Sequence, residues 1–580
     1  MAPDQHCTTR LWERAASDDP RHIVRFPGTE GGWGGHTWAE LGERVQAVGA
    51  GLIAAGVEPG DRVALLSGTR VEWTVSDLAV LAVGGVTVPL YDTSSVEQCA
   101  WVLRDSGARA AIVGTPEQAD RVGAAAGEQA TLEDVWVLDD GGLDALAERG
   151  ADRRDEVKGR SGGLGGDDLA TVIYTSGTTG RAKGCMLTHR NLVWTARQTQ
   201  LCISDVFGPD QSTLLFLPLA HVFARIIQFI CLENDTTMGY ARSVGQLGED
   251  LRSFRPTFLL SVPRVLEKVF NGARRAAEGP KRRVFDFAVS ASRTWSASPA
   301  PSRRVRLARG VADRLVYSRV REGLGGRVRY CISGGAPLSP YLAHFFAAAR
   351  VQVLEGYGLT ETSAPATVDR PGRYRVGSVG PPLPGVEVRV ADDGEVLVRG
   401  GNVFRGYWND EAATAEVLDA GGWFATGDLG ELDDEGALRI TGRKKELLVT
   451  AAGKNVAPAV LEERLKSHPL VSQAMCVGDR RPYVAALVTL DADEARAFAG
   501  ERGLPSSLPE LARSREVDEE VGGAVERANA VVSRAESIRR FTVLERDFDP
   551  DRDEVTPTLK IRRHVVAGHF AEQIESLYDA

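Results

Sequence analysis

The chain of 580 residues (62.4 kDa) is long enough for about three to four folding units, which excludes a peptide-sized or disulfide-held scaffold. Hydrophobic residues make up 43% and charged residues 26%, as in ordinary globular proteins. Because 79 Asp and Glu outnumber 69 Lys and Arg, the net charge of −10 argues against a protein that coats nucleic acid.

The cysteines and the first residues are typical of a cytosolic protein. No two cysteines have CxxC spacing and most lie in apolar segments, so we expect reduced core thiols. The opening MAPDQHCTTR predicts no secretory signal. The most apolar stretch, residues 214–232, is broken by polar residues, so we expect no membrane span. The seven cysteines are Cys7, Cys99, Cys185, Cys202, Cys231, Cys331 and Cys476.

From residue 37 to about residue 138, helix-like and strand-like segments alternate. The segments are TWAELGERVQAVGAGLIAAGV, DRVALLS, LAVLAVGGVTVPL and ARAAIVG. This order predicts an α/β fold with a parallel sheet and helices on its faces. Residues 139–168, rich in Gly, Asp and Arg, are expected to form a surface excursion.

A second α/β unit is expected to start at the strand LATVIYT. This strand and the later strands VRYCI and VQVL each run into a loop rich in glycine or hydroxyl groups. In open parallel sheets, ligands gather at the loops that follow the carboxyl ends of the strands. We therefore expect the active cleft there.

From about residue 385 the hydrophobic period changes to two, and DDG and DDEG signal hairpin turns, so we expect antiparallel β segments. After residue 443 the pattern becomes a compact α+β unit, followed by a charged helical region at about 491–536. A boundary at residues 442–445 would give a large N-terminal domain, residues 1–442, of layered α/β subdomains plus a β segment. Residues 443–580 would form a small mobile α+β domain.

The segment from residue 271 to residue 329 is strongly basic, with 15 Arg and Lys against four acidic residues. A solvated helical face explains such a run. The alternative is a site that meets an anionic membrane surface or substrate phosphates. No aromatic stacking platform accompanies the charge, which argues against nucleic acid.

The segment YTSGTTGRAKG, residues 174–184, carries the strongest chemical signal. Its glycines let backbone N–H groups approach phosphate oxygens, its hydroxyls donate to them, and Lys183 adds a positive charge. It does not fit GxxxxGK[ST], so it is not a Walker A loop. A dinucleotide-like run, residues 49–54, lies inside a helical pattern and is interpreted as helix packing.

These residues, with CMLTHRN after them, resemble the phosphate loop of the adenylate-forming enzymes: acyl-CoA synthetases, luciferases and peptide-synthetase adenylation domains. Further matching motifs follow in family order: FLPLAHVFAR, ISGGAPLS, EGYGLTET, GWFATGDLG, ITGRKKELLVTAAGKNVAPAVLE and TPTLKIRR. PLAHVFAR, GRKKELLVTAAGKNVAP and the long insert at 271–329 are most similar to bacterial long-chain fatty-acid–CoA ligases. Ala182 departs from the family, where many members have proline.

The resemblance implies a nucleotide site. The Tyr357 ring offers a stacking face for adenine, and Glu361 is an oxygen ligand suited to Mg²⁺. Thr360 is implied near the α-phosphate and Thr175 near the metal. The other residues implied to bind ATP are Ser176, Gly177, Thr178, Thr179, Gly180, Lys183, Gly335, Ala336, Pro337, Glu355 and Gly356.

The resemblance also implies roles for residues outside these loops. Asp428 would accept the two ribose hydroxyls, and Arg443 would complete recognition of ribose and phosphate. Lys560 would stabilise charge between the carboxylate and the α-phosphate. Lys445 occupies the hinge position.

Two residues would shape the acyl site. His221 resembles the gate between the thioester tunnel and the acyl pocket, with a satisfied core histidine as the alternative. The small Gly358 would leave depth for a long or bulky acyl group.

The expected reaction joins a long-chain fatty acid to coenzyme A through acyl-AMP, with ATP and Mg²⁺. Alternatives are a fatty acyl-AMP ligase that loads a carrier protein, a CoA ligase for an aryl or other non-fatty acid, and a noncatalytic nucleotide-binding scaffold. We expect small-molecule partners and no nucleic acid. The expected location is the cytoplasm, with contact at the inner membrane face through the basic segment as an alternative. The oligomeric state stays open, with a homodimer as one alternative.

Overall fold

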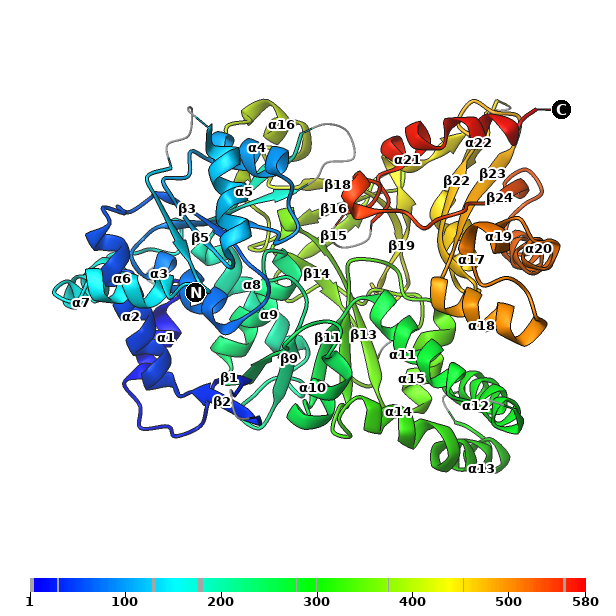
Figure 1. The fold of residues 1–580 in the computed structure, drawn as a ribbon, viewed down its shortest axis with the longest axis horizontal. Helices are drawn as coiled ribbons and strands as arrows, with labels where there is room; N and C mark the ends of the chain where they lie inside the picture. Colours follow the sequence, from blue (N-terminus) through cyan, green and yellow to red (C-terminus); the bar gives the residue numbers. More distant parts are fainter. Residues whose placement is uncertain are drawn as a thin grey trace.

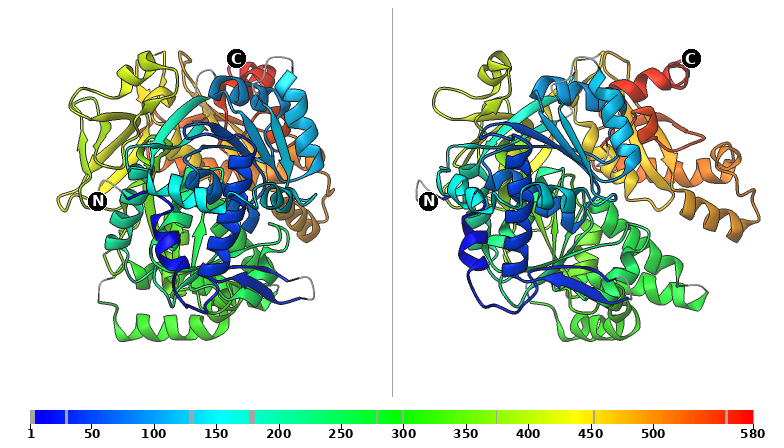
Figure 2. Two further views of the ribbon diagram at one scale, coloured as in Figure 1. Left: turned by 90° about the vertical axis from the view of Figure 1, so that its left-hand side faces the viewer. Right: turned by 60° about the vertical axis from the view of Figure 1, so that its left-hand side comes forward.

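The computed structural model describes residues 5–28, 31–127, 132–175, 181–277, 279–298, 300–373, 375–451, 453–556 and 560–579. Its N-terminal part is built from four sheets (Figures 1 and 2), and a smaller α+β part follows at the C-terminal end. The predicted α/β class is confirmed.

The first sheet has seven strands, five of them parallel. Helices cover both faces, and alternate residues of β3 serve the two layers: Val63 and Leu65 pack with α2 and α3, whereas Ala64 and Leu66 pack with α4. This alternation explains the apolar sequence, because a parallel sheet is buried on both faces. In spatial order the strands are β17 (Gly406–Tyr407), β8 (Lys183–Thr188), β7 (Leu169–Thr175), β4 (Val86–Leu90), β3 (Arg62–Leu66), β5 (Ala110–Val113) and β6 (Asp134–Val137).

Two expectations about this part of the chain were wrong. LATVIYT does not start a second unit, because as β7 it pairs with β4 and completes the first sheet. Residues 139–168 are not a plain surface excursion, because they form α6 (Gly142–Arg149) and α7 (Arg154–Gly162), which bury Leu146 and Val157 in the core. These helices are short and rich in Gly, Asp and Arg, so their composition resembles that of a loop.

The dinucleotide-like run lies inside a helix, as predicted. Residues 49–54 belong to α2 (Trp38–Ala54). A Cβ on Gly51 would lie 2.0 Å from the Leu146 carbonyl oxygen, so glycine is required for the contact with α6.

The remaining sheets of the N-terminal part have four strands each, and the third forms the predicted antiparallel β segment. The first contains β2 (Trp33–His36), β1 (Val24–Pro27), β10 (Thr237–Tyr240) and β9 (Ser212–Leu215). The second contains β11 (Phe258–Ser261), β12 (Tyr330–Ser333), β13 (Gln352–Leu359) and β14 (Ala364–Val368). The third contains β15 (Glu387–Val390), β16 (Glu395–Arg399), β18 (Phe424–Leu432) and β19 (Leu438–Arg443).

Helices fill the layers between and around these sheets. The remaining helices of the N-terminal part are α1 (Thr9–Ala15), α3 (Val71–Ala82), α4 (Val96–Ser106), α5 (Pro116–Ala126), α8 (His189–Cys202), α9 (Val222–Glu233), α10 (Leu247–Phe254), α11 (Pro263–Arg275), α12 (Pro280–Ser296), α13 (Arg303–Ala312), α14 (Ser318–Gly323), α15 (Pro340–Ala348) and α16 (Glu411–Val417). A π-helical turn, Asp313–Tyr317, joins α13 to α14.

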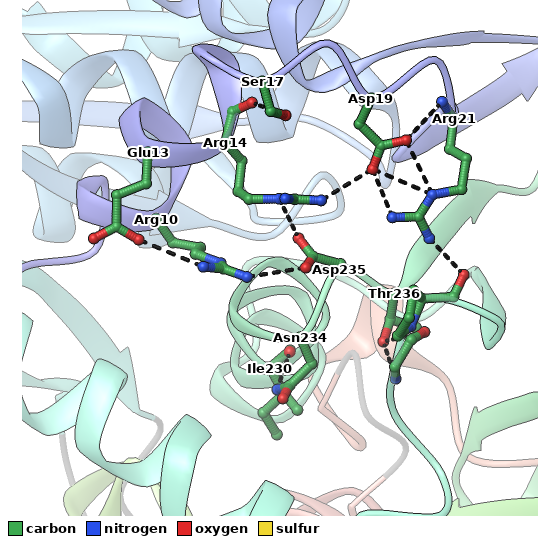
Figure 3. A network of polar contacts seen from close by, with 12 residues as sticks. Arg10, Glu13, Arg14, Ser17, Asp19, Arg21, Ile230, Asn234, Asp235 and Thr236 are labelled. Atoms are coloured by element: carbon green, nitrogen blue, oxygen red, sulfur yellow. Dashed lines mark hydrogen bonds and ion pairs between the residues drawn. The ribbon is translucent and has the colours of Figure 1, made fainter.

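Helix α1 is attached to the end of α9 by a polar network (Figure 3). Arg10 and Arg14 both pair with Asp235, with N–O distances of 2.9 and 2.8 Å. A second, fully buried network fixes the first turn of α9, where Arg225 Nε and Nη2 donate to Asp77 at 3.0 and 2.5 Å. Both networks fix the position of α9, and His221 is the N-cap of this helix.

The C-terminal part has its own hydrophobic cores, and its region at 491–536 is helical, as predicted. Its strands are β20 (Leu448–Val449), β21 (Asn455–Val456), β22 (Val471–Val477), β23 (Val484–Leu490) and β24 (Ile538–Val543). Its helices are α17 (Pro458–Lys466), α18 (Ala492–Arg502), α19 (Leu508–Ala512), α20 (Arg515–Asn529), α21 (Arg563–His569) and α22 (Ala571–Ser576). The boundary at residues 442–445 stays a prediction.

Two general expectations also bear on the fold. No helix in the described ranges is long and apolar enough to cross a membrane. All seven cysteines are free thiols and six of them are buried, as expected for core residues.

Candidate active site

A buried carboxylate, Asp428, is the centre of the predicted ribose site. Asp428 in β18 is the cross-strand partner of Arg443 in β19, and Arg443 Nε donates to Asp428 Oδ1 at 2.7 Å. The Tyr357 hydroxyl, from β13, donates to Asp428 Oδ2 at 2.8 Å. Each carboxylate oxygen has a second lone pair, so the group can still accept hydrogen bonds from two ligand hydroxyls.

The surroundings of Asp428 fix the protonation states of Tyr357 and Arg443. Burial and the neighbouring Asp428 raise the pKa of Tyr357, so its hydroxyl stays a donor. Burial alone would lower the pKa of Arg443, but Asp428 outweighs it and the pKa is raised. Since Tyr357 is only 8% exposed, its hydroxyl holds Asp428 while little of its ring is open for the predicted stacking on adenine.

The predicted magnesium ligand, Glu361, lies in the 3₁₀ turn Thr360–Thr362, directly after β13. Its Oε1 accepts a hydrogen bond from the Tyr407 hydroxyl at 2.9 Å. The backbone carbonyl of Glu361 accepts from Phe404 N at 2.8 Å. Both contacts come from the chain around β17, so the edge strand of the large sheet holds this turn.

The two arms of the predicted phosphate loop are cross-strand neighbours, with Thr175 at the end of β7 opposite Lys183 at the start of β8. Lys183 Nζ lies 5.0 Å from the centroid of the Tyr407 ring, within the range of a cation–π contact. Ala182, which stands where many family members have proline, is held by a hydrogen bond: Trp101 Nε1 donates to its carbonyl at 2.8 Å. Ser176, Gly177, Thr178, Thr179 and Gly180 lie outside the described residues.

Tyr407 is a site residue that the sequence did not reveal. It holds Glu361 through its hydroxyl and Lys183 through its ring, and thereby joins the acid of one loop to the base of another. The only local signal is a tyrosine in the segment FRGYWND. Its role depends on the pairing of β17 with β8, a tertiary contact.

The C-terminal part carries Lys560, which interacts electrostatically with residues of this site. Lys560 lies within electrostatic range of Arg443, Asp428 and Glu361. It is exposed to solvent, but surrounding protein atoms and then Arg443 lower its pKa. Its loop is closed by Thr556, whose Oγ1 accepts from Lys560 N at 3.0 Å.

His221 is the N-cap of α9, and its Nδ1 accepts from Phe223 N at 3.1 Å. Burial, with a contribution from Lys560, lowers its pKa to about 4. The side chain is therefore a neutral imidazole at physiological pH. The structure gives His221 a capping role. Its role as a gate to the acyl pocket stays a prediction.

The predicted adenine loop, Gly335–Pro337, is exposed between β12 and α15. Glu355 lies under this loop and is only 7% exposed, and its Oε2 accepts from Leu338 N at 3.2 Å. Burial and the nearby Asp369 raise the pKa of Glu355 to about 8. Glu355 thus supports the loop, whereas Gly356 and Tyr357 continue β13 toward Asp428.

The structure gives a different reason for the glycine at 358. A Cβ there would lie 1.6 Å from the carbonyl oxygen of Ala364, where the β13–β14 ladder shifts register. The close approach of β14 requires glycine, so the small size of Gly358 carries no information about pocket depth. Its place in the acyl pocket stays a prediction.

Lys445 is exposed in the turn that links β19 to the C-terminal part. Its neighbour Lys444 pairs with Asp393 and Glu395, with N–O distances of 2.6 and 2.8 Å. The turn is therefore attached to the β15–β16 hairpin. The hinge role of Lys445 stays a prediction.

The donor set suits a magnesium ion that arrives with phosphate. Glu361 and Thr175 supply a carboxylate and a hydroxyl, and Mg²⁺ in nucleotide sites often takes one or two carboxylates together with substrate phosphates. No group of three His, Cys, Asp or Glu residues able to hold a metal occurs among the described residues. The chain thus fits Mg²⁺ as a partner of a nucleotide.

Comparison with protein families agrees with this geometry. Residues 12–408 match the family model of the AMP-binding enzymes, and residues 445–580 match the AMP-binding enzyme C-terminal domain. The long-chain-fatty-acid–CoA ligase FadD15 of Mycobacterium bovis is 45% identical over 97% of this chain and 95% of its own length. Human long-chain-fatty-acid–CoA ligase 1 is 31% identical over 93% of this chain and 82% of its own length.

Two solved structures share the fold. The anthranilate CoA ligase AuaEII, solved with anthranoyl-AMP, has a TM-score of 0.74 and 19% identity, covering 98% of each chain. The adenylation domain of a carboxylate reductase from Mycobacterium chelonae has a TM-score of 0.76 and 24% identity, covering 99% of this chain and 91% of its own. With family models matched over both parts of the chain, this protein belongs to the AMP-binding enzymes.

Proposed function

We propose that this protein is an ATP-dependent ligase that converts a long-chain fatty acid into its coenzyme A thioester, with acyl-AMP as intermediate. The observation that carries the proposal is the buried Asp428, held by Arg443 and Tyr357 with distances of 2.7 and 2.8 Å. Lys560, from the C-terminal part, interacts electrostatically with Asp428. The close similarity to curated long-chain-fatty-acid–CoA ligases supports the substrate class.

In the first half-reaction, a carboxylate oxygen of the fatty acid attacks the α-phosphorus of ATP. The bond from that phosphorus to the bridging oxygen breaks, which gives acyl-AMP and pyrophosphate. Asp428 binds the ribose, and Lys183 offsets the charge of the phosphates. Lys560 provides a cation where negative charge builds up, an effect of preorganised groups that is typically large.

Glu361 and Thr175 would hold Mg²⁺, which supplies charge neutralisation on the phosphates. Tyr407 fixes the carboxylate of Glu361 by donating to its Oε1. The chain therefore orients the metal-binding group before the nucleotide arrives.

In the second half-reaction, the thiolate of coenzyme A attacks the acyl carbon. The bond between that carbon and the phosphate oxygen breaks, AMP leaves, and the proton of the thiol passes to solvent. In the family this step follows rotation of the C-terminal domain, and we assign the hinge to Lys445. His221, a neutral side chain at the start of α9, would border the path of the thiol.

The alternatives differ in the acceptor and in the acid. A fatty acyl-AMP ligase would form the same adenylate but pass it to a carrier protein, and an aryl-CoA ligase would reject long aliphatic acids. The test is release of AMP and pyrophosphate from the purified chain with Mg·ATP and acids from acetate to palmitate, with and without coenzyme A. Palmitoyl-CoA is the expected product, whereas adenylate that never reaches coenzyme A would identify a carrier-loading enzyme.

We further propose that the enzyme works in the cytoplasm and contacts the inner membrane face through its basic segment. Helices α12 and α13 lie at the outer edge of the molecule (Figure 1). Leu307, Val311 and Leu315 recur every four residues and are 72%, 46% and 47% exposed. Residues 281–321 carry eleven Lys and Arg and only two acidic residues, so an anionic bilayer complements this face.

Vesicle sedimentation tests this contact. The wild-type chain is expected to bind vesicles that contain phosphatidylglycerol and not to bind vesicles of pure phosphatidylcholine. The change Leu307→Asp should weaken binding at least several-fold. Leu201→Asp is the matched control, because Leu201 is also well exposed, at 64%, but lies on α8. Equal losses in the two variants would refute a specific membrane face.

A further inference from the structure

Helix α11 of the N-terminal part forms ion pairs with the C-terminal part through two arginines. Arg264 Nη2 lies 3.2 Å from Asp491 Oδ2, and Arg275 Nη1 lies 2.6 Å from Glu494 Oε1. Arg264 Nη2 also donates to Ser472 Oγ at 3.0 Å. Arg264 and Arg275 are eleven residues apart, close to three helical turns, so both project from one face of α11.

The acidic partners both belong to the start of α18. Asp491 is the N-cap of this helix, and its Oδ1 accepts from the backbone N–H groups of Asp493 and Glu494 at 3.1 Å each. Its other oxygen, Oδ2, meets Arg264. Negative charge in the first turn of a helix is favoured by the helix dipole, so α18 stabilises the two acidic side chains that meet the arginines.

These ion pairs are more sheltered than ordinary surface pairs. The side chain of Glu494 is 9% exposed and that of Asp491 is 18% exposed. Fully exposed pairs contribute only about 0–1 kcal/mol, whereas shielding from water strengthens the attraction and makes loss of a partner costly. The contacts are therefore able to bias the orientation of the C-terminal part.

The orientation that they favour is the one in which Lys560 reaches the site. Lys560 and α18 belong to the same C-terminal part, and in this orientation Lys560 interacts electrostatically with Asp428 and Glu361. Across the described residues, one further side-chain contact between the two parts lies close to the Lys560 loop: Gln98 Nε2 donates to Asp553 Oδ1 at 3.4 Å. This single long hydrogen bond is weaker than the α11 pairs, so α11 supplies the main polar attachment.

We infer that Arg264 and Arg275 are positioning residues that hold the C-terminal part in the orientation for acyl-AMP formation. The inference rests on the proposed two-step ligase activity. Neither arginine touches the nucleotide site. Both act through the placement of Lys560, and their ion pairs must break before the C-terminal part can turn for thioester formation.

The test compares the two half-reactions in the variant Arg264→Ala/Arg275→Ala. Pyrophosphate release in the first turnover, with Mg·ATP and palmitate but no coenzyme A, should slow about five- to tenfold. Thioester formation from added palmitoyl-AMP and coenzyme A should stay within about twofold of wild type or become faster. The matched control is Lys268→Ala, which removes a positive charge from an exposed position of α11.

A structural measurement separates this inference from the proposed activity. Spin labels at Val244→Cys and Arg515→Cys, in a Cys202→Ser background, report the distance between the two parts by pulsed electron resonance without any substrate. Val244 is 70% exposed, and the side chain of Arg515 is 87% exposed. The double arginine variant should broaden the distance distribution, and the Lys268 variant should not.

The possible outcomes are distinct. Unchanged distances, equal slowing of both half-reactions, or an equal effect of Lys268→Ala would each overturn the positioning role. If the wild-type chain forms no palmitoyl-CoA, the proposed activity fails, and the distance measurement still decides whether α11 holds the C-terminal part.

Discussion

The Tyr407 hydroxyl donates a hydrogen bond to Glu361 Oε1 at 2.9 Å, while the ring of the same tyrosine lies 5.0 Å from Lys183 Nζ. One side chain thus joins the predicted metal ligand to the lysine of the phosphate loop. Tyr407 reaches both because β17 pairs with β8 at the edge of the large sheet.

Removing the Tyr407 hydroxyl should impair the first half-reaction. Hydrogen bonds to charged groups contribute about 1.5–3 kcal/mol, so Tyr407→Phe should slow acyl-AMP formation about tenfold or more and raise the Mg²⁺ concentration needed for half-maximal rate. The measurement is first-turnover pyrophosphate release across a Mg²⁺ series. Tyr483→Phe is the control, since that hydroxyl donates to Leu577 O far along the chain. An unchanged Mg²⁺ dependence in Tyr407→Phe would contradict the role.

Neutralising Lys560 should slow acyl-AMP formation much more than thioester formation. Lys560→Gln, which also mimics acetylation, removes the cation and should slow acyl-AMP formation by about 10² to 10³, or roughly 3–4 kcal/mol. Thioester formation from added acyl-AMP should change much less. Because the pKa of Lys560 is lowered, wild-type adenylation should also decline with rising pH below the ordinary lysine pKa. Full activity of the glutamine variant would dismiss both the role and acetylation as a switch.

The buried pair Glu355 and Asp369 should make stability depend on pH. Burial raises the pKa of Glu355 to about 8, and burial also raises that of Asp369 to about 7. The folded chain keeps these protons at pH values where the unfolded chain has lost them. The free energy of unfolding should therefore fall as pH rises from about 4 through about 8.

The substitution Glu355→Gln should remove part of this slope, because the amide keeps an acceptor for Leu338 N and cannot ionise. Urea unfolding midpoints at pH 6 and pH 8.5 measure the effect. Glu431→Gln, at a side chain 64% exposed, is the control and should follow wild type. A wild-type midpoint that rises with pH would show that the pair is ionised.

Breaking the buried ion pair under α9 should destabilise the whole N-terminal part. Asp77 and Arg225 have side chains 0% and 1% exposed, so Asp77→Asn leaves a buried cation without its counter-charge. Losses of about 3–5 kcal/mol are typical. Thermal unfolding would measure the loss, and the exposed pair Arg399–Glu387 gives the control Glu387→Gln, with an expected shift near zero.

The hinge assignment predicts an asymmetric defect. Lys445→Pro restricts φ at the position that should change conformation between the half-reactions, so thioester formation should suffer more than acyl-AMP formation. Rates of the two half-reactions, measured separately, give the ratio. Lys444→Ala tests the neighbouring attachment to Asp393 and Glu395 and should not reproduce the asymmetry. Equal loss of both steps in Lys445→Pro would count against a hinge.

The sequence by itself determined the fold class and supplied the candidate site residues. Period-two and helical patterns are local, so they located the strands and helices of 37–138 and the hairpins after residue 385. Motif resemblance identified Lys183, Glu361, Asp428, Arg443 and Lys560. The family models matched at 12–408 and 445–580 agree with that resemblance.

The tertiary structure decided which residues meet and why some are there. Tyr407 contacts site residues because β17 pairs with β8. Position 358 requires glycine because Ala364 approaches it closely, and Glu355 supports its loop because it is buried beneath it. The segment LATVIYT belongs to the first sheet because, as β7, it pairs with β4. Propensity and motif act over a few residues, whereas these relationships depend on burial and hydrogen bonding between segments far apart in the chain, which no local pattern encodes.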